Sequence, residues 1–201
     1  MWKIMKYIIS TIVNWPLYVA LKIMADFLND KYAQMWYEDA ANFPNRNFFQ
    51  LLAERPYYRT VLFYRLKIIG SIFRHFYPTY THFNLPSYKK VPIGAGIYLD
   101  HPYSTVLSAT SIGKNFKTKQ LVTVGNNRGR RPSIGNNVFI GAGAVVCGGI
   151  VIGDNVQIGA GTLIIGDVNV GDNVVIGAGS VVVKDVEANR IVVGNPAHYI
   201  K

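Results

Sequence analysis

The sequence predicts a mainly β protein built as a three-sided parallel solenoid, preceded by a helical region. Two observations predict the solenoid: β-branched aliphatic residues recur every six positions from Ile134 to Val182, and groups of three such units repeat every eighteen. A third observation, a change of composition near residue 85, separates the helical region from the repeat. The expected parts are a helical region over 1–85, the solenoid over 86–193 and a C-terminal tail over 194–201.

The six-residue period is continuous over nine units, whose first positions are Ile134, Ile140, Val146, Ile152, Ile158, Ile164, Val170, Ile176 and Val182. Three residues after each comes Asn, Asp or Gly, the types that tolerate positive φ at a tight corner. These corner positions are Asn137, Gly143, Gly149, Asn155, Gly161, Asp167, Asn173, Gly179 and Asp185. A spacing of six fits no helical face, and β-branched residues and glycine disfavour helix. Each unit is therefore expected to be one short strand and one corner.

The longer period shows in the corner sequences. "IGNN", "IGDN" and "VGDN" begin at 134, 152 and 170, and "IGAG" begins at 140, 158 and 176. Three units therefore make one coil, and successive coils are expected to stack about 4.8 Å apart by parallel strand pairing. The aliphatic residue at each first position is predicted to point into a narrow prism.

The first 85 residues contain all three Trp, most of the Tyr and Phe, and no six-residue period. In the first fifteen residues, polar and apolar positions separate onto two helical faces, which predicts an amphipathic helix. The apolar run between Lys6 and Lys22 is interrupted by Pro16 and is shorter than the roughly 20 residues of a transmembrane helix. A secretory signal is disfavoured because no small-x-small cleavage site follows. Two alternatives remain: helices that pack on each other or on neighbouring subunits, and a helix resting on a membrane surface.

Charge and cysteine content limit the class of protein. The net charge is +10, and residues 1–90 carry most of the excess, with 12 Lys and Arg against 5 Asp and Glu. This balance suits an anionic partner such as a membrane surface, an anionic cofactor or an acidic glycan, and no motif supports nucleic-acid binding. The single Cys147 excludes a disulfide framework and is expected to be a small packing residue. The expected compartment is the cytoplasm, with membrane association as the alternative.

Two breaks interrupt the repeat, which can be followed back to Ile93. Ten residues instead of six separate Val124 from Ile134, so "GNNRGRRPS" is expected to be an inserted loop, and insertions in solenoids often lie on the binding face. Thirteen residues instead of twelve separate Leu99 from Ile112.

The stretch "GIYLDHPYS" lies in this second break and contains His101, the one histidine inside the coils ahead of the tail. Imidazole is suited to take a hydroxyl proton near neutral pH, and a packed structural histidine is the alternative. With one histidine in the repeat, no metal site is expected.

The run "GIYLDH…IGKN…RRPSIG…IGAGAVV…GNPA" resembles the serine O-acetyltransferase branch of the hexapeptide-repeat acyltransferases, over roughly residues 91–201. The resemblance implies a left-handed parallel β-helix and a homotrimer whose active sites lie between adjacent solenoids. It also implies direct transfer of an acetyl group from acetyl-CoA to an acceptor hydroxyl, without an acetyl-enzyme.

On the acceptor side, the resemblance assigns His101 as general base. It places Asp100 in contact with the acceptor and Arg130 on the acceptor's carboxylate, with Arg131 in the same loop. As a neighbour on a strand, Asp100 is expected to point away from His101. On the donor side, the positions that match those lining the pantetheine arm or reaching a CoA phosphate are Ala142, Ala160, Gly161 and Lys201.

Two positions depart from the family pattern. Arg131 replaces a second histidine, and Pro86 stands where an aspartate that orients the catalytic histidine is expected. The acceptor is therefore either serine or a sugar hydroxyl, as in similar enzymes that acetylate capsular or exopolysaccharide sugars. A non-catalytic trimeric scaffold at the membrane surface is the third alternative.

Overall fold

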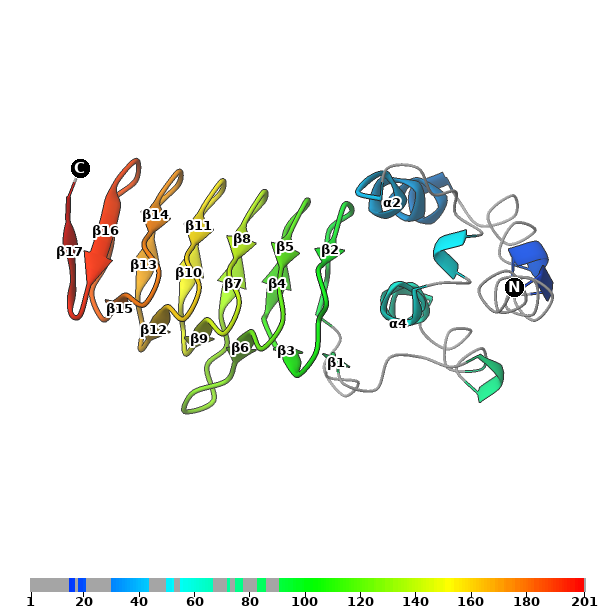
Figure 1. The fold of residues 1–201 in the computed structure, drawn as a ribbon, viewed down its shortest axis with the longest axis horizontal. Helices are drawn as coiled ribbons and strands as arrows, with labels where there is room; N and C mark the ends of the chain where they lie inside the picture. Colours follow the sequence, from blue (N-terminus) through cyan, green and yellow to red (C-terminus); the bar gives the residue numbers. More distant parts are fainter. Residues whose placement is uncertain are drawn as a thin grey trace, which may run out of the picture. The chain divides into compact units, whose positions relative to one another are not determined.

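The computed structural model describes residues 15–16, 18–20, 30–43, 50–52, 55–66, 72, 75–77, 83–85 and 91–200. Two compact units make up the chain, Met1–Thr81 and His82–Lys201. Most of the predicted amphipathic helix in the first fifteen residues lies outside the described residues. Figure 1 shows the elements of each unit.

The N-terminal unit contains the helices α2 (Asp30–Ala41) and α4 (Pro56–Arg65). Proline at the first position of α4 suits a helix start, where its missing N–H has no helical acceptor. The two helices share a buried ion pair, in which Nη2 of Arg65 lies 3.1 Å from both carboxylate oxygens of Asp39. The Tyr58 hydroxyl donates to the carbonyl of Trp36 at 2.8 Å, and burial raises the pKa of Tyr58. No helix among the described residues is long and apolar enough to cross a membrane.

The second unit is a parallel β-solenoid with three sheets (Figure 1). The six-stranded sheet contains, in spatial order, β1 (Phe83–Asn84), β3 (Thr105–Leu107), β6 (Thr123–Gly125), β9 (Val145–Cys147), β12 (Leu163–Ile165) and β15 (Val181–Val182). The four-stranded sheet contains β13 (Asn169–Val170), β10 (Val151–Ile152), β7 (Ser133–Ile134) and β4 (Ser111–Ile112). The seven-stranded sheet contains β17 (Ala197–Tyr199), β16 (Ile191–Gly194), β14 (Val175–Ile176), β11 (Gln157–Ile158), β8 (Phe139–Ile140), β5 (Lys117–Thr118) and β2 (Tyr98–Leu99).

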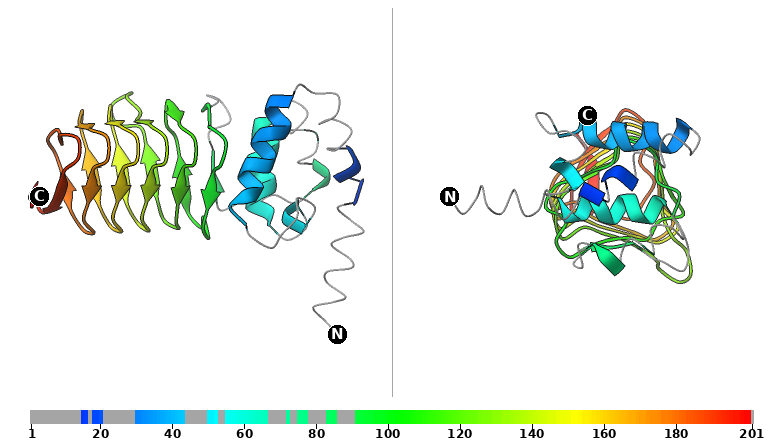
Figure 2. Two further views of the ribbon diagram at one scale, coloured as in Figure 1. Left: turned by 90° about the horizontal axis from the view of Figure 1, so that it is seen from above. Right: turned by 90° about the vertical axis from the view of Figure 1, so that its right-hand side faces the viewer.

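The register between coils confirms the predicted period. Ile140 pairs with Ile158, which pairs with Ile176, each eighteen residues further along the chain. Successive coils therefore lie side by side with their strands in line (Figure 2). The predicted mainly β solenoid is confirmed.

The prism interior contains all nine predicted aliphatic positions, each of them buried. A second inward position follows four residues after each, and its residues are also buried. They are Val138, Ala144, Ile150, Val156, Thr162, Val168, Val174, Ser180 and Val186. Each six-residue side thus contributes two side chains to the core, and the second of these is small or β-branched in every case.

The corners follow the prediction on two edges of the prism and differ on the third. Positive φ occurs as expected at Asn137, Gly143, Asn155, Gly161, Asn173 and Gly179. On the third edge the prediction was wrong, because φ is positive at Gly148 and Gly166 instead of one residue later. The strands β9 and β12 that precede this edge have three residues, and the chain turns directly after them. A Cβ on Gly148 would also clash with the carbonyl oxygen of Gly166.

The edge between the four-stranded and seven-stranded sheets, which we call the asparagine edge, comprises residues 113–115, 135–137, 153–155, 171–173 and 187–189. Asn115, Asn137, Asn155, Asn173 and Asn189 occupy one corner position with positive φ. The side-chain amides of the first four each donate to the amide oxygen in the next coil, at 2.9 to 3.1 Å. Asparagine tolerates this backbone conformation and supplies both a donor and an acceptor, so the ladder ties the coils together.

Asp154, on the same edge, makes stability depend on pH. Its carboxylate accepts the backbone N–H of Asn136 at 2.6 Å, and this bond, with a second from the Asn136 side chain, holds the pKa of Asp154 below its ordinary value of 3.8. A carboxylate with a lowered folded-state pKa stabilises the fold above the unfolded value, and the contribution is lost as pH falls through the folded value. We expect the midpoint temperature of thermal unfolding to fall less in Asp154→Asn than in the parent as the pH is lowered from 5 to 2–3. Parallel pH profiles would contradict this.

Both ends of the solenoid extend the predicted boundaries. β1 lies in the region predicted to be helical, and it pairs in parallel with β3. A C-terminal tail outside the solenoid was predicted over 194–201. Instead β17 turns back and pairs antiparallel with β16, with Val193 opposite His198. The hairpin thus adds one antiparallel strand at the C-terminal end of the seven-stranded sheet.

Candidate active site

The edge between the seven-stranded and six-stranded sheets carries the candidate site. We call it the histidine edge; it comprises residues 100–104, 119–121, 141–143, 159–161 and 177–179. Backbone hydrogen bonds align these corners, since Gly143 donates to Gln120 at 3.0 Å and Gly161 donates to Ala142 at 2.8 Å. Residues far apart in sequence are thus brought into one row along the prism.

His101 lies in a corner that is two residues longer than the corresponding corner of the next coil. Eight residues lead from Leu99 to Leu107, whereas six lead from Thr118 to Val124, the residues with which they pair. The backbone of His101 has φ of 50°, and the N–H of Tyr103 donates to its carbonyl at 2.6 Å. The imidazole is 79% exposed. The ring therefore lies outside the prism of its own chain and is not packed in its core.

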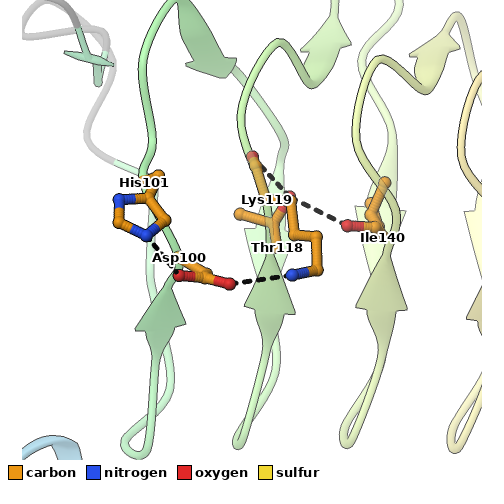
Figure 3. A network of polar contacts seen from close by, with 5 residues as sticks. All are labelled: Asp100, His101, Thr118, Lys119 and Ile140. Atoms are coloured by element: carbon orange, nitrogen blue, oxygen red, sulfur yellow. Dashed lines mark hydrogen bonds and ion pairs between the residues drawn. The ribbon is translucent and has the colours of Figure 1, made fainter.

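The carboxylate of Asp100 connects His101 to the next coil (Figure 3). Nε2 of His101 lies 3.4 Å from Oδ1 of Asp100, and Nζ of Lys119 lies 2.8 Å from Oδ2. The prediction that Asp100 points away from His101 was wrong. Alternation holds only within a strand, and β2 ends at Leu99, so Asp100 and His101 already belong to the corner.

Lys119 was missed in the sequence, although a signal was present. "TKQL" at 118–121 occupies the corner where later coils have "IGAG", so Lys119 stands in line with Gly141, Gly159 and Gly177. A lysine at a position that is glycine in the later coils indicates that this corner has a different role from the others. The hydrogen bond to Asp100 and then its charge raise the pKa of Lys119.

The predicted donor-binding residues Ala142, Ala160 and Gly161 lie on the histidine edge, in the coils beyond His101. Ala160 and Gly161 are exposed and Ala142 is half-buried. Gly161 has φ of 67°, and a Cβ there would meet nothing within 4 Å, so glycine is required by the backbone and the space outside it is open. The row can accept an extended ligand along the prism.

The arginine loop lies on a different edge. Residues 126–132 connect β6 to β7, on the edge between the six-stranded and four-stranded sheets, which we call the loop edge. Within the loop Asn127 and Arg130 exchange backbone hydrogen bonds at 2.9 and 3.0 Å. The Arg130 guanidinium pairs with Asp167 at 2.5 Å, and Arg131 is half-buried. One chain therefore does not bring Arg130 and Arg131 onto the edge of His101.

Lys201 lies outside the described residues, so its contact with a CoA phosphate stays a prediction. His198, on β17, is exposed. Among the described residues, no group of three His, Cys, Asp or Glu side chains is placed to hold a metal ion.

The repeat sequence identifies the class of the solenoid. Residues 131–166 and 149–184 match the family model described as bacterial transferase hexapeptide (six repeats). Residues 131–184 of the solenoid are therefore hexapeptide repeats. No curated protein sequence matches the chain.

Solved structures of serine acetyltransferases share the fold. The soybean enzyme complexed with serine is 22% identical, with a TM-score of 0.59 over 90% of this chain and 73% of that one. The Neisseria gonorrhoeae enzyme in complex with serine is 22% identical, with a TM-score of 0.56 over 89% and 72%. The Brucella melitensis serine O-acetyltransferase is 22% identical, with a TM-score of 0.53 over 89% and 70%.

Proposed function

We propose that the protein is an acetyl-CoA-dependent O-acetyltransferase with His101 as the general base. The observation that supports this is the exposed imidazole on the same edge as the small residues Ala142, Ala160 and Gly161. The hexapeptide repeats and the fold shared with serine acetyltransferases point to the same chemistry.

In the proposed reaction the neutral imidazole of His101 takes the proton of the acceptor hydroxyl as that oxygen attacks the thioester carbonyl carbon. The tetrahedral intermediate collapses with cleavage of the C–S bond, which leaves the acetyl ester and the CoA thiolate. The imidazolium returns the proton to the thiolate sulfur. An imidazole that is open to solvent and fixed at a corner is suited to both transfers.

The acceptor is serine or a sugar hydroxyl. Structural neighbours in complex with serine and the arginines of the loop, whose guanidinium fork suits a carboxylate, favour serine. Arg131 in place of a histidine, and Tyr103, a 52% exposed aromatic two residues from His101, favour a sugar ring.

We further propose that the protein is a homotrimer. The outward face of the six-stranded sheet is apolar, with Val145, Leu163 and Val181 half-buried and Ile165 and Val183 exposed in one chain. This sheet is bounded by the histidine edge on one side and the loop edge on the other. Packing of copies on it would bring the arginine loop of one chain toward His101 of another. Light scattering should give three times the 22.4 kDa of one chain.

The proposed activity is tested by release of free thiol from acetyl-CoA with serine, nucleotide sugars and oligosaccharides as acceptors. We expect acceptor-dependent release with one of these classes and an acetyl ester in the product. Binding of vesicles without binding of acetyl-CoA would instead support a scaffold at a membrane surface.

Ala160→Trp tests the donor row. A bulky side chain on the histidine edge should obstruct the donor, and we expect the KM for acetyl-CoA to rise roughly tenfold or more, the effect of about 1.4 kcal/mol of lost binding. Gln157→Trp, which adds the same ring on the exposed face of β11, is the matched control and should leave this KM unchanged. Equal KM values for the two variants would remove Ala160 from the donor site.

A further inference from the structure

The polar network at the histidine edge joins two coils through one carboxylate. Asp100 and His101 belong to the corner after β2, and Lys119 belongs to the corner after β5. The carboxylate uses one oxygen for each partner, with Oδ1 toward Nε2 of His101 and Oδ2 toward Nζ of Lys119 (Figure 3).

We propose that Lys119 is a positioning residue whose ammonium group holds the Asp100 carboxylate against the His101 imidazole, so that the ring is oriented for proton transfer. The inference rests on the proposed function of His101 as general base. It gives this chain its own orienting group, since Pro86 stands where the related enzymes are expected to have the orienting aspartate.

The backbone on which Lys119 stands is well fixed. The Lys119 N–H donates to the carbonyl of Ile140 at 3.3 Å, and the Thr118 hydroxyl donates to the same carbonyl at 3.2 Å. Thr118 is 1% exposed and replaces an inward aliphatic residue. On the other side, the Asp100 N–H donates to the carbonyl of Thr118 at 2.8 Å. Both corners are thus anchored through hydrogen bonds of Thr118.

The proposed orientation implies a tautomer of the neutral ring, because Nε2 is the nitrogen near the carboxylate. The nitrogen that faces a carboxylate carries the hydrogen, and the opposite nitrogen keeps its lone pair. With Nε2 toward Asp100, Nδ1 is the nitrogen that accepts the hydroxyl proton. If the carboxylate were released, both tautomers would be populated, and the base would face the acceptor for only part of the time.

Lys119 also balances charge. Its ammonium group offsets the charge of the Asp100 carboxylate, which it approaches to 2.8 Å. The charged groups with contacts to the network are Asp100, His101 and Lys119, and the ionisable Tyr98 on β2 acts on Lys119. The hydrogen bond with Asp100 raises the pKa of Lys119, so the ammonium persists throughout the neutral range.

The test compares Lys119→Met with Lys119→Arg and with Lys117→Met. Lys117 is exposed on β5, the strand that precedes Lys119, so its substitution also removes one positive charge but leaves the ion pair with Asp100 in place. For Lys119→Met we expect kcat to fall roughly tenfold, because the ring is then in the reactive orientation for only part of the time. The KM for acetyl-CoA should stay unchanged. Lys119→Arg should keep the parental kcat, and so should Lys117→Met.

A second measurement needs no turnover. Ring ¹⁵N shifts of the full chain, with His101 assigned through His101→Asn, should show the hydrogen on Nε2 in the parent and in Lys117→Met. In Lys119→Met the shifts should move toward a mixture of tautomers. Unchanged shifts and an unchanged kcat in a folded Lys119→Met protein would overturn the positioning role while leaving acetyl transfer intact. If no acceptor is acetylated, the proposed function fails, and the shifts still decide whether Lys119 orients the ring.

Discussion

Replacement of His101 by asparagine should lower kcat for acetyl transfer by about 10²–10⁴-fold, the usual contribution of general acid–base catalysis. The hydroxyl of an acceptor is a weak nucleophile until its proton is taken, and the amide of asparagine has no basic nitrogen. Asparagine is preferred to alanine here because the residue has φ of 50°, a conformation that asparagine tolerates. The loss can then be attributed to the ring rather than to the corner.

The control for this substitution is His75→Asn, which removes an exposed imidazole from the N-terminal unit. It should retain parental kcat. Binding of acetyl-CoA, measured by calorimetry, should be similar in the parent and in His101→Asn, because the base does not contribute to the donor row. A His101→Asn protein that transfers acetyl groups at the parental rate would show that another group takes the proton.

Replacement of Arg65 by methionine should destabilise the N-terminal unit by about 3–5 kcal/mol, because it leaves the buried carboxylate of Asp39 without its ion-pair partner. The side chains of Arg65 and Asp39 are 4% and 3% exposed. Burial lowers the pKa of Arg65, and the charge of Asp39 opposes this effect. Each charge of the pair therefore offsets the cost of burying the other.

Tryptophan fluorescence can follow this unit separately, since all three tryptophans precede residue 37. With a urea dependence of about 1–3 kcal/mol per molar, the midpoint should fall by at least about 1 M. The double substitution Asp39→Leu with Arg65→Met, which removes both charges, should recover much of the loss. A midpoint that is the same in the parent and in Arg65→Met would show that the pair does not stabilise the unit.

The solenoid could be predicted from sequence because one residue type at one spacing determines its interior. Ile140, Ile158 and Ile176 point inward for the same reason, so the prediction at each supports the others. The third corner could not be located because it depends on whether a strand has two residues or three. Gly148 and Gly149 are equally good turn residues, and the extra strand residue in β9 selects the first of them.

The residues of the candidate site could be proposed from the sequence, and their geometry only in part. His101 and the small residues of the proposed donor row follow from a break in the repeat and from the resemblance, and their roles stay predictions. The direction of Asp100 was wrong because the end of β2 could not be placed to within one residue. Lys119 was missed because its partner lies one coil away, a distance that becomes short only once the register is known. Arg130 and Arg131 were expected near His101, and a single chain places them on another edge.

The stacking of the corners divides the histidine edge into equal steps. Each coil adds about 4.8 Å, so the coil of Ala142 lies about 10 Å from that of His101, and the coil of Ala160 about 14 Å. A long donor molecule bound along this edge would therefore meet successive corners at regular intervals of about 4.8 Å. Insertion or deletion of eighteen residues would lengthen or shorten this edge by one whole coil while the inward pattern of the repeat was kept.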